Sequence, residues 1–397
     1  MLDDTLAVID RSIGMNKRDD GLYNAYNILQ LSKDEASFES LYPMLEGQVA
    51  ALSAGAIGPE EAAVIVEALF DSDVYRPDQN SFMLYPDRKL PRFLEKNQVA
   101  ENQVQAVALL EKMLTKGDRR IITQDANGVY RFNVDFANVG DLDAALDALM
   151  PEYGGDVEAA REPVKQLYEQ VFNHSEFTGR SGGMFGFEGL GCIYWHMVSK
   201  LLLAVQENFF SALDRGCDAA LLQRLGELYY RVRAGIGFNK TPEEYGAFPT
   251  DPYSHTPRHS GAKQPGMTGQ VKEEVLSRFG ELGVRVENGA VRFEPRLLRA
   301  REFVQEARQF RYVDVDGQWQ EIDVPKGGLA FTWCQVPVVY QLSDDASTLL
   351  MLRGRNGDQE TLTELALSPE LSAQPLPRSG QIRQLTVKFG TNLLLET

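Results

Sequence analysis

The stretch from Val284 to Pro295, VRVENGAVRFEP, marks the point where the sequence changes from helical to β-strand character. Valine and phenylalanine alternate with other residues on both sides of Asn288-Gly289, the favoured pair for a two-residue type I′ turn. This pattern predicts a β-hairpin. Short alternating runs separated by turn residues continue toward the C-terminus, for example FRYVDVDGQWQEIDV (310–324) and QIRQLTVKF (381–389). We therefore predict an all-β, sandwich-like domain over residues 283–397.

Upstream of this hairpin, apolar residues mostly recur with helical spacing. Pro59 fits the first turn of such a helix, because the N–H group that proline lacks would have no helical partner there. The pattern predicts a mainly α domain over residues 1–282, with a domain boundary near residue 283. The periodic segments are 36–55, 59–70, 99–114, 142–150, 157–172, 188–212, 219–232 and 268–282.

The composition excludes several classes of ligand. With 40 Lys and Arg against 57 Asp and Glu, the formal net charge is −17. Such a charge disfavours binding to nucleic acid backbones or to anionic membrane surfaces. A neutral, polyhydroxylated ligand meets no such repulsion.

The sequence also predicts a cytoplasmic protein. No stretch approaches the roughly 18 consecutive apolar residues of a membrane span. The acidic first residues, MLDDTLAVIDRSI, do not resemble a secretory signal. Cys192, Cys217 and Cys334 are scattered and show no CxxC spacing, so we expect neither a disulfide framework nor a cysteine metal site.

Three stretches combine glycine, proline, aromatic and polar residues at high density, and helix or strand periodicity does not explain them. They are 75–97, 174–200 and 237–270. The last has no helical period over its whole length, and connections this long are often functional. The four histidines, at 174, 196, 255 and 259, fall within the second and third stretches. Pro257 separates the last two histidines, so they do not form a helical metal-binding pair, and we expect no metal site.

The second stretch carries six glycines and leads into a helix predicted to begin near Glu188. A helix N-terminus of this kind can bind an anion such as phosphate. The pattern is neither a Walker A loop nor a GxGxxG after a strand. Glu188 can equally serve to complement the helix dipole, and Trp195 and His196 can equally be ordinary core residues.

The third stretch supplies the groups that sugar recognition needs. Asp251, Tyr253, His255, Lys263 and Gln264 offer a carboxylate, an aromatic ring, an imidazole, an ammonium and an amide. Aromatic faces stack on sugar rings, and polar groups bind the hydroxyls. The alternative is a structural loop stiffened by its five prolines.

The order of these segments resembles the catalytic region of inverting glycoside phosphorylases of the cellobiose and chitobiose phosphorylase type, members of the (α/α)6 toroid clan. The resemblance rests on RSGGMFGFEGLG (180–191), QPGMTGQ (264–270) and GAVRFEPRLL (289–298). DGLYNAYN (20–27), YRPDQNSFMLYPDR (75–88) and FPTDPYSHTP (248–257) also resemble bacterial cellobiose-phosphorylase-like proteins. The resemblance implies an (α/α) toroid-like helical domain followed by a β domain.

The resemblance also implies a carbohydrate-active enzyme that cleaves or phosphorolyses a glycosidic bond with inversion. Its substrate would be an oligosaccharide or glycoside, with inorganic phosphate as co-substrate and no cofactor. Glu188 is the candidate acid, with Asp251 and Glu176 as alternatives for acid or base. The candidates for binding sugar or phosphate are Arg180, Trp195, His196, Tyr253, His255, His259, Lys263 and Gln264, with the rings of Trp195 and Tyr253 as stacking platforms.

Two departures from the phosphorylase pattern support an alternative. The Asp-Trp-Asn-Asp segment that carries the general acid in those enzymes is not found here, and about eight convincing helices are predicted where a six-pair toroid needs twelve. The alternative is a non-catalytic carbohydrate-binding or scaffold subunit. A homo-oligomer, or association with a further domain or chain that completes the site, would also fit.

Overall fold

The computed structural model describes residues 2–86, 92–172, 174, 193, 195–236, 268–343 and 349–395. Contacts between Cα atoms divide the chain into two compact units. Unit 1 comprises Met1–Tyr26, Tyr42–Leu84 and Ile193–Thr397, and unit 2 comprises Asn27–Leu41 and Tyr85–Cys192. Most of unit 2 is therefore an insertion, because the chain of unit 1 stops at Leu84 and resumes at Ile193.

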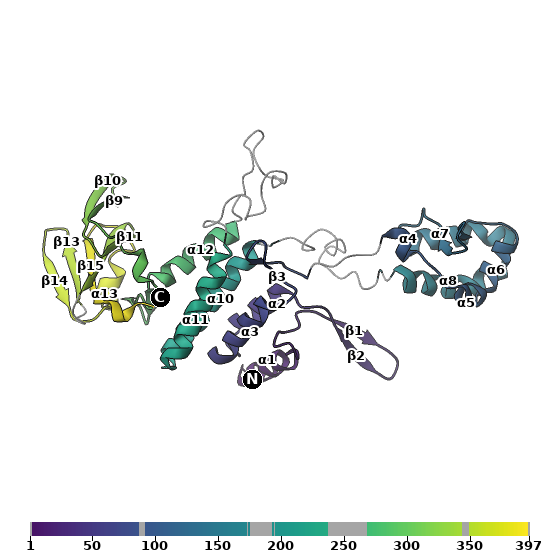
Figure 1. The fold of residues 1–397 in the computed structure, drawn as a ribbon, viewed down its shortest axis with the longest axis horizontal. Helices are drawn as coiled ribbons and strands as arrows, with labels where there is room; N and C mark the ends of the chain where they lie inside the picture. The colour runs from purple at the N-terminus through teal and green to yellow at the C-terminus, as the bar shows by residue number, and fades with distance from the viewer. Residues whose placement is uncertain are drawn as a thin grey trace. The chain divides into compact units, whose positions relative to one another are not determined.

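The helical part of unit 1 is built around one long helix, α10 (Trp195–Asp214), which packs against four other helices (Figure 1). Residues on several sides of α10 are buried, as expected for a helix with neighbours all round. The Asp218 side chain caps the next helix by accepting a hydrogen bond from the Leu221 N–H at 2.8 Å. The neighbours of α10 are α2 (Leu45–Ser53), α3 (Pro59–Phe70), α11 (Ala219–Ala234) and α12 (Thr268–Glu281); α1 (Leu2–Met15) precedes them.

A short hairpin of β3 (Tyr75–Arg76) and β4 (Ser81–Phe82) follows α3 and leads to the insertion. Directly after β4, Met83 forms an isolated antiparallel bridge with Ile193, just before α10. The point where the chain leaves unit 1 and the point where it returns are therefore adjacent.

Unit 2 has a hydrophobic core of its own, formed by its helices and a small hairpin. The Asn138 side chain caps the helix that begins at Val139 by accepting a hydrogen bond from the Gly140 N–H at 2.7 Å. Leu110, Phe132, Leu146 and Tyr168 are fully buried in this core. The elements are β1 (Asn27–Leu31), β2 (Ala36–Ser40), α4 (Phe93–Lys96), α5 (Glu101–Gln105), α6 (Ala108–Thr115), β5 (Ile122–Gln124), β6 (Tyr130–Phe132), α7 (Val139–Tyr153) and α8 (Gly155–Phe172).

After α12 the chain becomes rich in strands, as predicted. Hairpin β7 (Val284–Glu287) and β8 (Ala290–Phe293) turns at Asn288 and Gly289, whose φ angles of 49° and 80° confirm the type I′ turn. The predicted boundary near residue 283 lies at this change from helix to strand, inside unit 1. The toroid and the sandwich remain predictions.

The largest sheet of this region has five strands in the order β11-β12-β15-β13-β14. Strands β12 and β15 are parallel, and the other neighbours are antiparallel. The core beneath the sheet contains the rings of Phe293, Tyr340 and Phe389. The strands are β11 (Gly328–Trp333), β12 (Val336–Ser343), β13 (Leu349–Gly354), β14 (Gln359–Leu362) and β15 (Ile382–Gly390); β9 (Arg308–Val313) pairs with β10 (Trp319–Val324), and η3 (Ala300–Glu302), α13 (Pro369–Ala373) and η4 (Thr391–Leu393) complete the region.

The structure corrects two of the predicted helices. Residues 36–40 form strand β2, not the start of a helix, and α2 begins only at Leu45. Pro43 disfavours helical geometry at the residue before it, while Phe38 finds a cross-strand partner in Leu29. The predicted helix 99–114 is two short helices, α5 and α6. Of the helices that the structure describes, none has both the length and the apolar composition needed to cross a bilayer.

Candidate functional site

Two of the sequence-predicted site residues, Trp195 and His196, lie among the described residues, at the start of α10. The other nine lie outside them: Glu176, Arg180, Glu188, Asp251, Tyr253, His255, His259, Lys263 and Gln264. Their roles stay predictions.

His196 joins α10 to α12. Its Nε2 lies 3.0 Å from Oε2 of Glu273, and the two side chains are 21% and 13% exposed. The preceding Trp195 is 8% exposed and packs within the helical part of unit 1. A histidine held by a carboxylate in a mostly buried position has a fixed ring orientation, which suits either a structural link or a positioned polar group.

Described residues of the first two unusual stretches, and described residues on either side of the third, lie close together at one end of these helices. The Met83–Ile193 bridge places the segment after β4 beside the start of α10. The same segment lies against the end of α11, because a Cβ atom on Gly235 would come within 2.3 Å of the Asn80 carbonyl oxygen. The His196–Glu273 pair adds the first half of α12. We take this helix end as the candidate functional site.

Three elements of this part of unit 1, namely β4, α10 and α12, each carry a buried hydroxyl group. The hydroxyls of Ser81 in β4, Ser199 in α10 and Ser277 in α12 are buried and have no hydrogen-bond partner among the described residues. Unsatisfied buried polar groups cost free energy, so natural proteins keep few of them. Their concentration in elements that border the candidate site is consistent with a region that serves more than packing.

A buried charge cluster fixes α11 and α12 further along the bundle. The Glu281 side chain is 2% exposed and accepts a hydrogen bond from the Tyr229 hydroxyl at 2.7 Å. Arg233 contacts the same carboxylate at 2.5 Å, and Arg278 contacts its other oxygen. Burial, followed by the charge of Glu281, raises the pKa of Tyr229 well above its ordinary value. With both carboxylate oxygens occupied, Glu281 anchors the helices and does not face a ligand.

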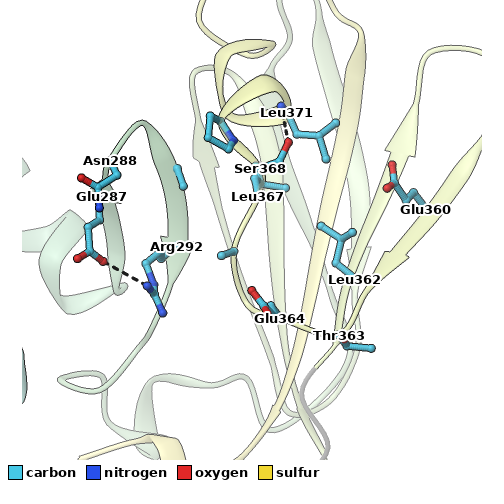
Figure 2. Close-up of a pocket in the computed structure, with 13 residues that line it drawn as sticks. Glu287, Asn288, Arg292, Glu360, Leu362, Thr363, Glu364, Leu367, Ser368 and Leu371 are labelled. Atoms are coloured by element: carbon cyan, nitrogen blue, oxygen red, sulfur yellow. Dashed lines mark hydrogen bonds and ion pairs between the residues drawn. The ribbon is translucent and has the colours of Figure 1, made fainter.

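A separate groove of about 610 Å³ lies between the β7–β8 hairpin and the segment after β14 (Figure 2). Glu360 and Glu364 line one side, and Glu287 and Arg292 line the other and form an ion pair at 3.2 Å. The Ser368 hydroxyl accepts a hydrogen bond from the Leu371 N–H, which closes the first turn of α13. The groove has no aromatic wall and its arginine is already paired, so it is a poor fit for stacked sugars or for phosphate. Among the described residues, no cluster of histidine, cysteine and carboxylate side chains could hold a metal ion.

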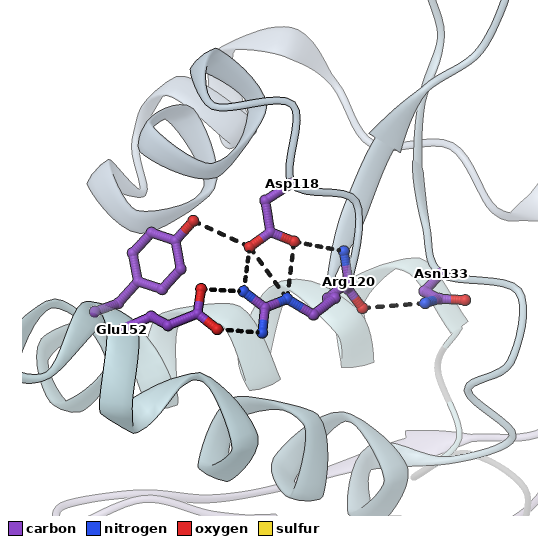
Figure 3. Close-up of polar contacts among 5 residues, drawn as sticks. Asp118, Arg120, Asn133 and Glu152 are labelled. Atoms are coloured by element: carbon purple, nitrogen blue, oxygen red, sulfur yellow. Dashed lines mark hydrogen bonds and ion pairs between the residues drawn. The ribbon is translucent and has the colours of Figure 1, made fainter.

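In unit 2, a polar network ties the residues before β5 to the end of α7 (Figure 3). Arg120 contacts Asp118 at 2.6 Å and Glu152 at 2.7 Å, and Asn133 donates a hydrogen bond to the Arg120 carbonyl. The hydroxyl of Tyr153 donates to Asp118 at 3.0 Å. Hydrogen bonds from Arg120 lower the pKa of Asp118 to about 2. The network closes the unit on itself and leaves no free catalytic carboxylate.

Part of unit 2 matches a known protein family. Residues 90–175 match the family model described as GH149 phosphorylase insertion domain 2. The chain thus resembles the glycoside phosphorylase family GH149. The matched range falls within the inserted part of unit 2, so sequence and structure outline the same insertion. A search of curated proteins gives no match.

The matched range contains none of the segments on which the predicted resemblance to glycoside phosphorylases rested. Those segments are 20–27, 75–88 and several between residues 170 and 300, and the match now supports the resemblance. The insertion could not be recognised from periodicity, because α7 and α8 have the same amphipathic pattern as the helices of unit 1. The available signal was the density of glycine, proline and aromatic residues in 75–97 and 174–200, which flank the insertion on both sides.

Proposed function

We propose that the protein is a carbohydrate-active enzyme related to glycoside phosphorylases, which cleaves or phosphorolyses the glycosidic bond of an oligosaccharide with inversion. The observation that carries the proposal is the match of residues 90–175 to a phosphorylase insertion domain, in a unit that the structure also separates as an insertion. The same resemblance supports an (α/α) toroid-like helical domain.

In the proposed reaction, Glu188 protonates the glycosidic oxygen of the leaving sugar. An oxygen of inorganic phosphate attacks the anomeric carbon from the opposite face as the carbon–oxygen bond breaks, which gives a sugar 1-phosphate with inverted configuration. Asp251 and Glu176 are the alternative carboxylates, and either would activate water if the reaction is a hydrolysis. Arg180 and Lys263 are the proposed phosphate ligands.

The remaining proposed residues bind the sugar. His196, His255, His259 and Gln264 would hold hydroxyl groups, and Tyr253 would offer a ring face. Trp195 belongs to the same proposal, although its ring is 8% exposed in the structure. Its contribution would then come from shaping the site through packing as much as from stacking.

The experiment that tests this proposal is an incubation of the protein with α- and β-linked oligosaccharides, with and without phosphate, followed by detection of sugar phosphate and free sugar. We expect sugar 1-phosphate only when phosphate is present. Glu188→Gln should abolish the product and leave the melting temperature unchanged. The matched control is Glu227→Gln, because Glu227 is an exposed carboxylate on α11 and its variant should retain full turnover.

A second candidate function is a non-catalytic carbohydrate-binding subunit. The observation that favours it is the missing Asp-Trp-Asn-Asp segment, since the tryptophans of the chain stand at 195, 319 and 333 in other contexts. Saturable binding of a sugar without product formation across the panel would support this second function and contradict the first.

A further inference from the structure

The hairpin of β9 and β10 presents an exposed tryptophan. Trp319 is 65% exposed at the start of β10, whereas Trp195 is 8% exposed. An exposed tryptophan offers a ligand a flat apolar ring face and an N–H donor. This exposed ring lies in the strand-rich C-terminal region, outside the candidate site at the helix end.

The register of the hairpin gathers polar side chains around this ring. Trp319 pairs with Val313, Glu321 with Arg311, and Asp323 with Gln309. Because side chains alternate along each strand, these six lie on one face. All six are exposed, whereas Phe310, Tyr312, Ile322 and Val324 on the other face are partly or fully buried. The outward face, defined by these six residues, combines one aromatic ring with a guanidinium, two carboxylates and an amide.

An arginine lies over the ring of Trp319, which nonetheless stays largely exposed. The guanidinium carbon of Arg311 is 5.0 Å from the centre of the ring. By contrast, the guanidinium of Arg299 lies 3.6 Å from the centre of the Tyr230 ring and covers it. Arg311 is instead drawn toward Glu321, whose carboxylate is 3.2 Å away. Trp319 is 65% exposed beside this pair, so much of its side chain remains available to a ligand.

The turn that precedes Trp319 is held firmly. Asp314 is 7% exposed, and its Oδ1 accepts hydrogen bonds from the N–H groups of Asp316 and Gln318. Its Oδ2 accepts a further hydrogen bond from the Gln320 side chain at 2.9 Å. The Gln335 side chain donates to the Asp314 carbonyl at 2.8 Å, which ties the turn to the β11–β12 turn. A platform that is fixed before binding loses little conformational entropy when a ligand arrives.

We propose that this outward face is an oligosaccharide-binding site, with Trp319 as the stacking platform and Arg311, Glu321 and Gln309 as hydrogen-bonding groups. Charge argues for a neutral ligand: Arg311 is already paired with Glu321, and Asp323 leaves the face with a negative charge that repels phosphate backbones. Trp319 and Val313 are the only apolar members of the face, too small an area for a stable protein interface. A sugar with one apolar ring face and many hydroxyls fits this chemistry.

This site shares its ligand class with the proposed function but requires no catalysis. The test is isothermal titration of the full chain with four probes at up to about 10 mM: cellohexaose, laminarihexaose, maltohexaose and chitohexaose. Three variants accompany the wild type. Trp319→Ala removes the platform, Trp319→Tyr keeps an aromatic ring, and Leu376→Ala removes another exposed apolar side chain, 63% exposed, of the same region.

We expect at least one probe to bind the wild type with a Kd on the order of 1 mM or tighter. Trp319→Ala should weaken that binding at least tenfold, Trp319→Tyr should retain most of it, and Leu376→Ala should match the wild type. Turnover of short substrates by Trp319→Ala should equal that of the wild type. If no turnover is found for any protein, the proposed function fails while the binding result still stands.

Three outcomes would overturn the proposal. One is that no probe binds the wild type, and another is that Trp319→Ala binds as tightly as the wild type. The third is that light scattering shows a change of oligomeric state in Trp319→Ala with sugar affinity unchanged, because the face would then be a protein interface.

Discussion

The charge clusters around Glu281 in unit 1 and Arg120 in unit 2 are built from the same parts but differ in burial. Each joins arginine, two carboxylates or more, and a tyrosine hydroxyl. The carboxylates of Glu281 and Glu302 are 2% and 21% exposed, whereas those of Asp118 and Glu152 are 12% and 57% exposed. Solvent screens the exposed cluster, so its ion pairs contribute little. In the buried cluster, removing one partner leaves a charge without compensation. We therefore expect the loss of stability on substitution to depend on the burial of the group and not on its number of ion pairs.

The largest effect is expected for Glu281→Gln. The change leaves Arg233 and Arg278, which are 18% and 39% exposed, beside a neutral amide, and should lower the free energy of unfolding by about 3 kcal/mol. Urea denaturation followed by circular dichroism measures this loss. Glu227→Gln on the exposed side of α11 is the control and should have no effect. A loss below about 1 kcal/mol for Glu281→Gln would contradict the comparison.

The next effect concerns a buried amide in unit 2. Asn97 is fully buried, and its side chain donates to the Phe132 carbonyl and accepts from the Phe132 N–H, both at 2.9 Å. Asn97→Ala leaves both backbone groups without a partner and should cost about 2–3 kcal/mol of unfolding free energy. The neighbouring exposed Gln98→Ala is the matched control in the same denaturation experiment. Equal urea denaturation midpoints for Asn97→Ala and Gln98→Ala would contradict this prediction.

A smaller, pH-dependent effect is expected for Asp118. Its pKa of about 2 lies below the ordinary value of 3.8, chiefly because Arg120 donates hydrogen bonds to the charged carboxylate. The stabilisation is fully present above pH 3.8 and is lost as the pH falls toward 2. Asp118→Asn should cost about 1 kcal/mol at neutral pH, since solvent screens the cluster.

The same variant should also lose less stability than the wild type between pH 4 and pH 2, which a series of melting curves would reveal. Parallel melting curves for the two proteins over this interval would mean that Asp118 is not the group responsible.

The smallest effect is expected for Arg161→Ala. Arg161 contacts Asp143 at 2.6 Å and also Asp147, and the two carboxylates are 39% and 67% exposed. Despite two ion pairs, the variant should show no measurable change in its denaturation midpoint. A loss as large as that of Asn97→Ala would show that the number of ion pairs matters more than their burial.

The parts of the fold that depend on neighbouring residues could be predicted from the sequence. Asn288-Gly289 specifies its turn because both residues tolerate a positive φ, and the helical stripe of 59–70 is a local pattern. The helix predicted for residues 36–40 was wrong because their apolar spacing also suits a helix. The pairing of Phe38 with Leu29 shows that they form a strand. That partner belongs to a segment that showed no strand signal of its own.

The candidate site was less predictable. Trp195 and His196 were identified from residue type, but the partner of His196 is Glu273, which lies far along the chain in α12. The Met83–Ile193 bridge likewise spans the whole insertion. Contacts of this kind leave no periodic signal, because each is a single pair of residues brought together by the packing of distant elements.

The Met83–Ile193 bridge also has a consequence for the order of folding. Forming it in an unfolded chain requires closing a loop of more than a hundred residues, at an entropic cost of about 4 kcal/mol. If unit 2 collapses first around its own core, most of that loop is already condensed and the closure becomes cheaper. During synthesis, α10 and everything after it emerge later than the insertion. Helices α2 and α3 therefore cannot pack against α10 until the insertion has been synthesised.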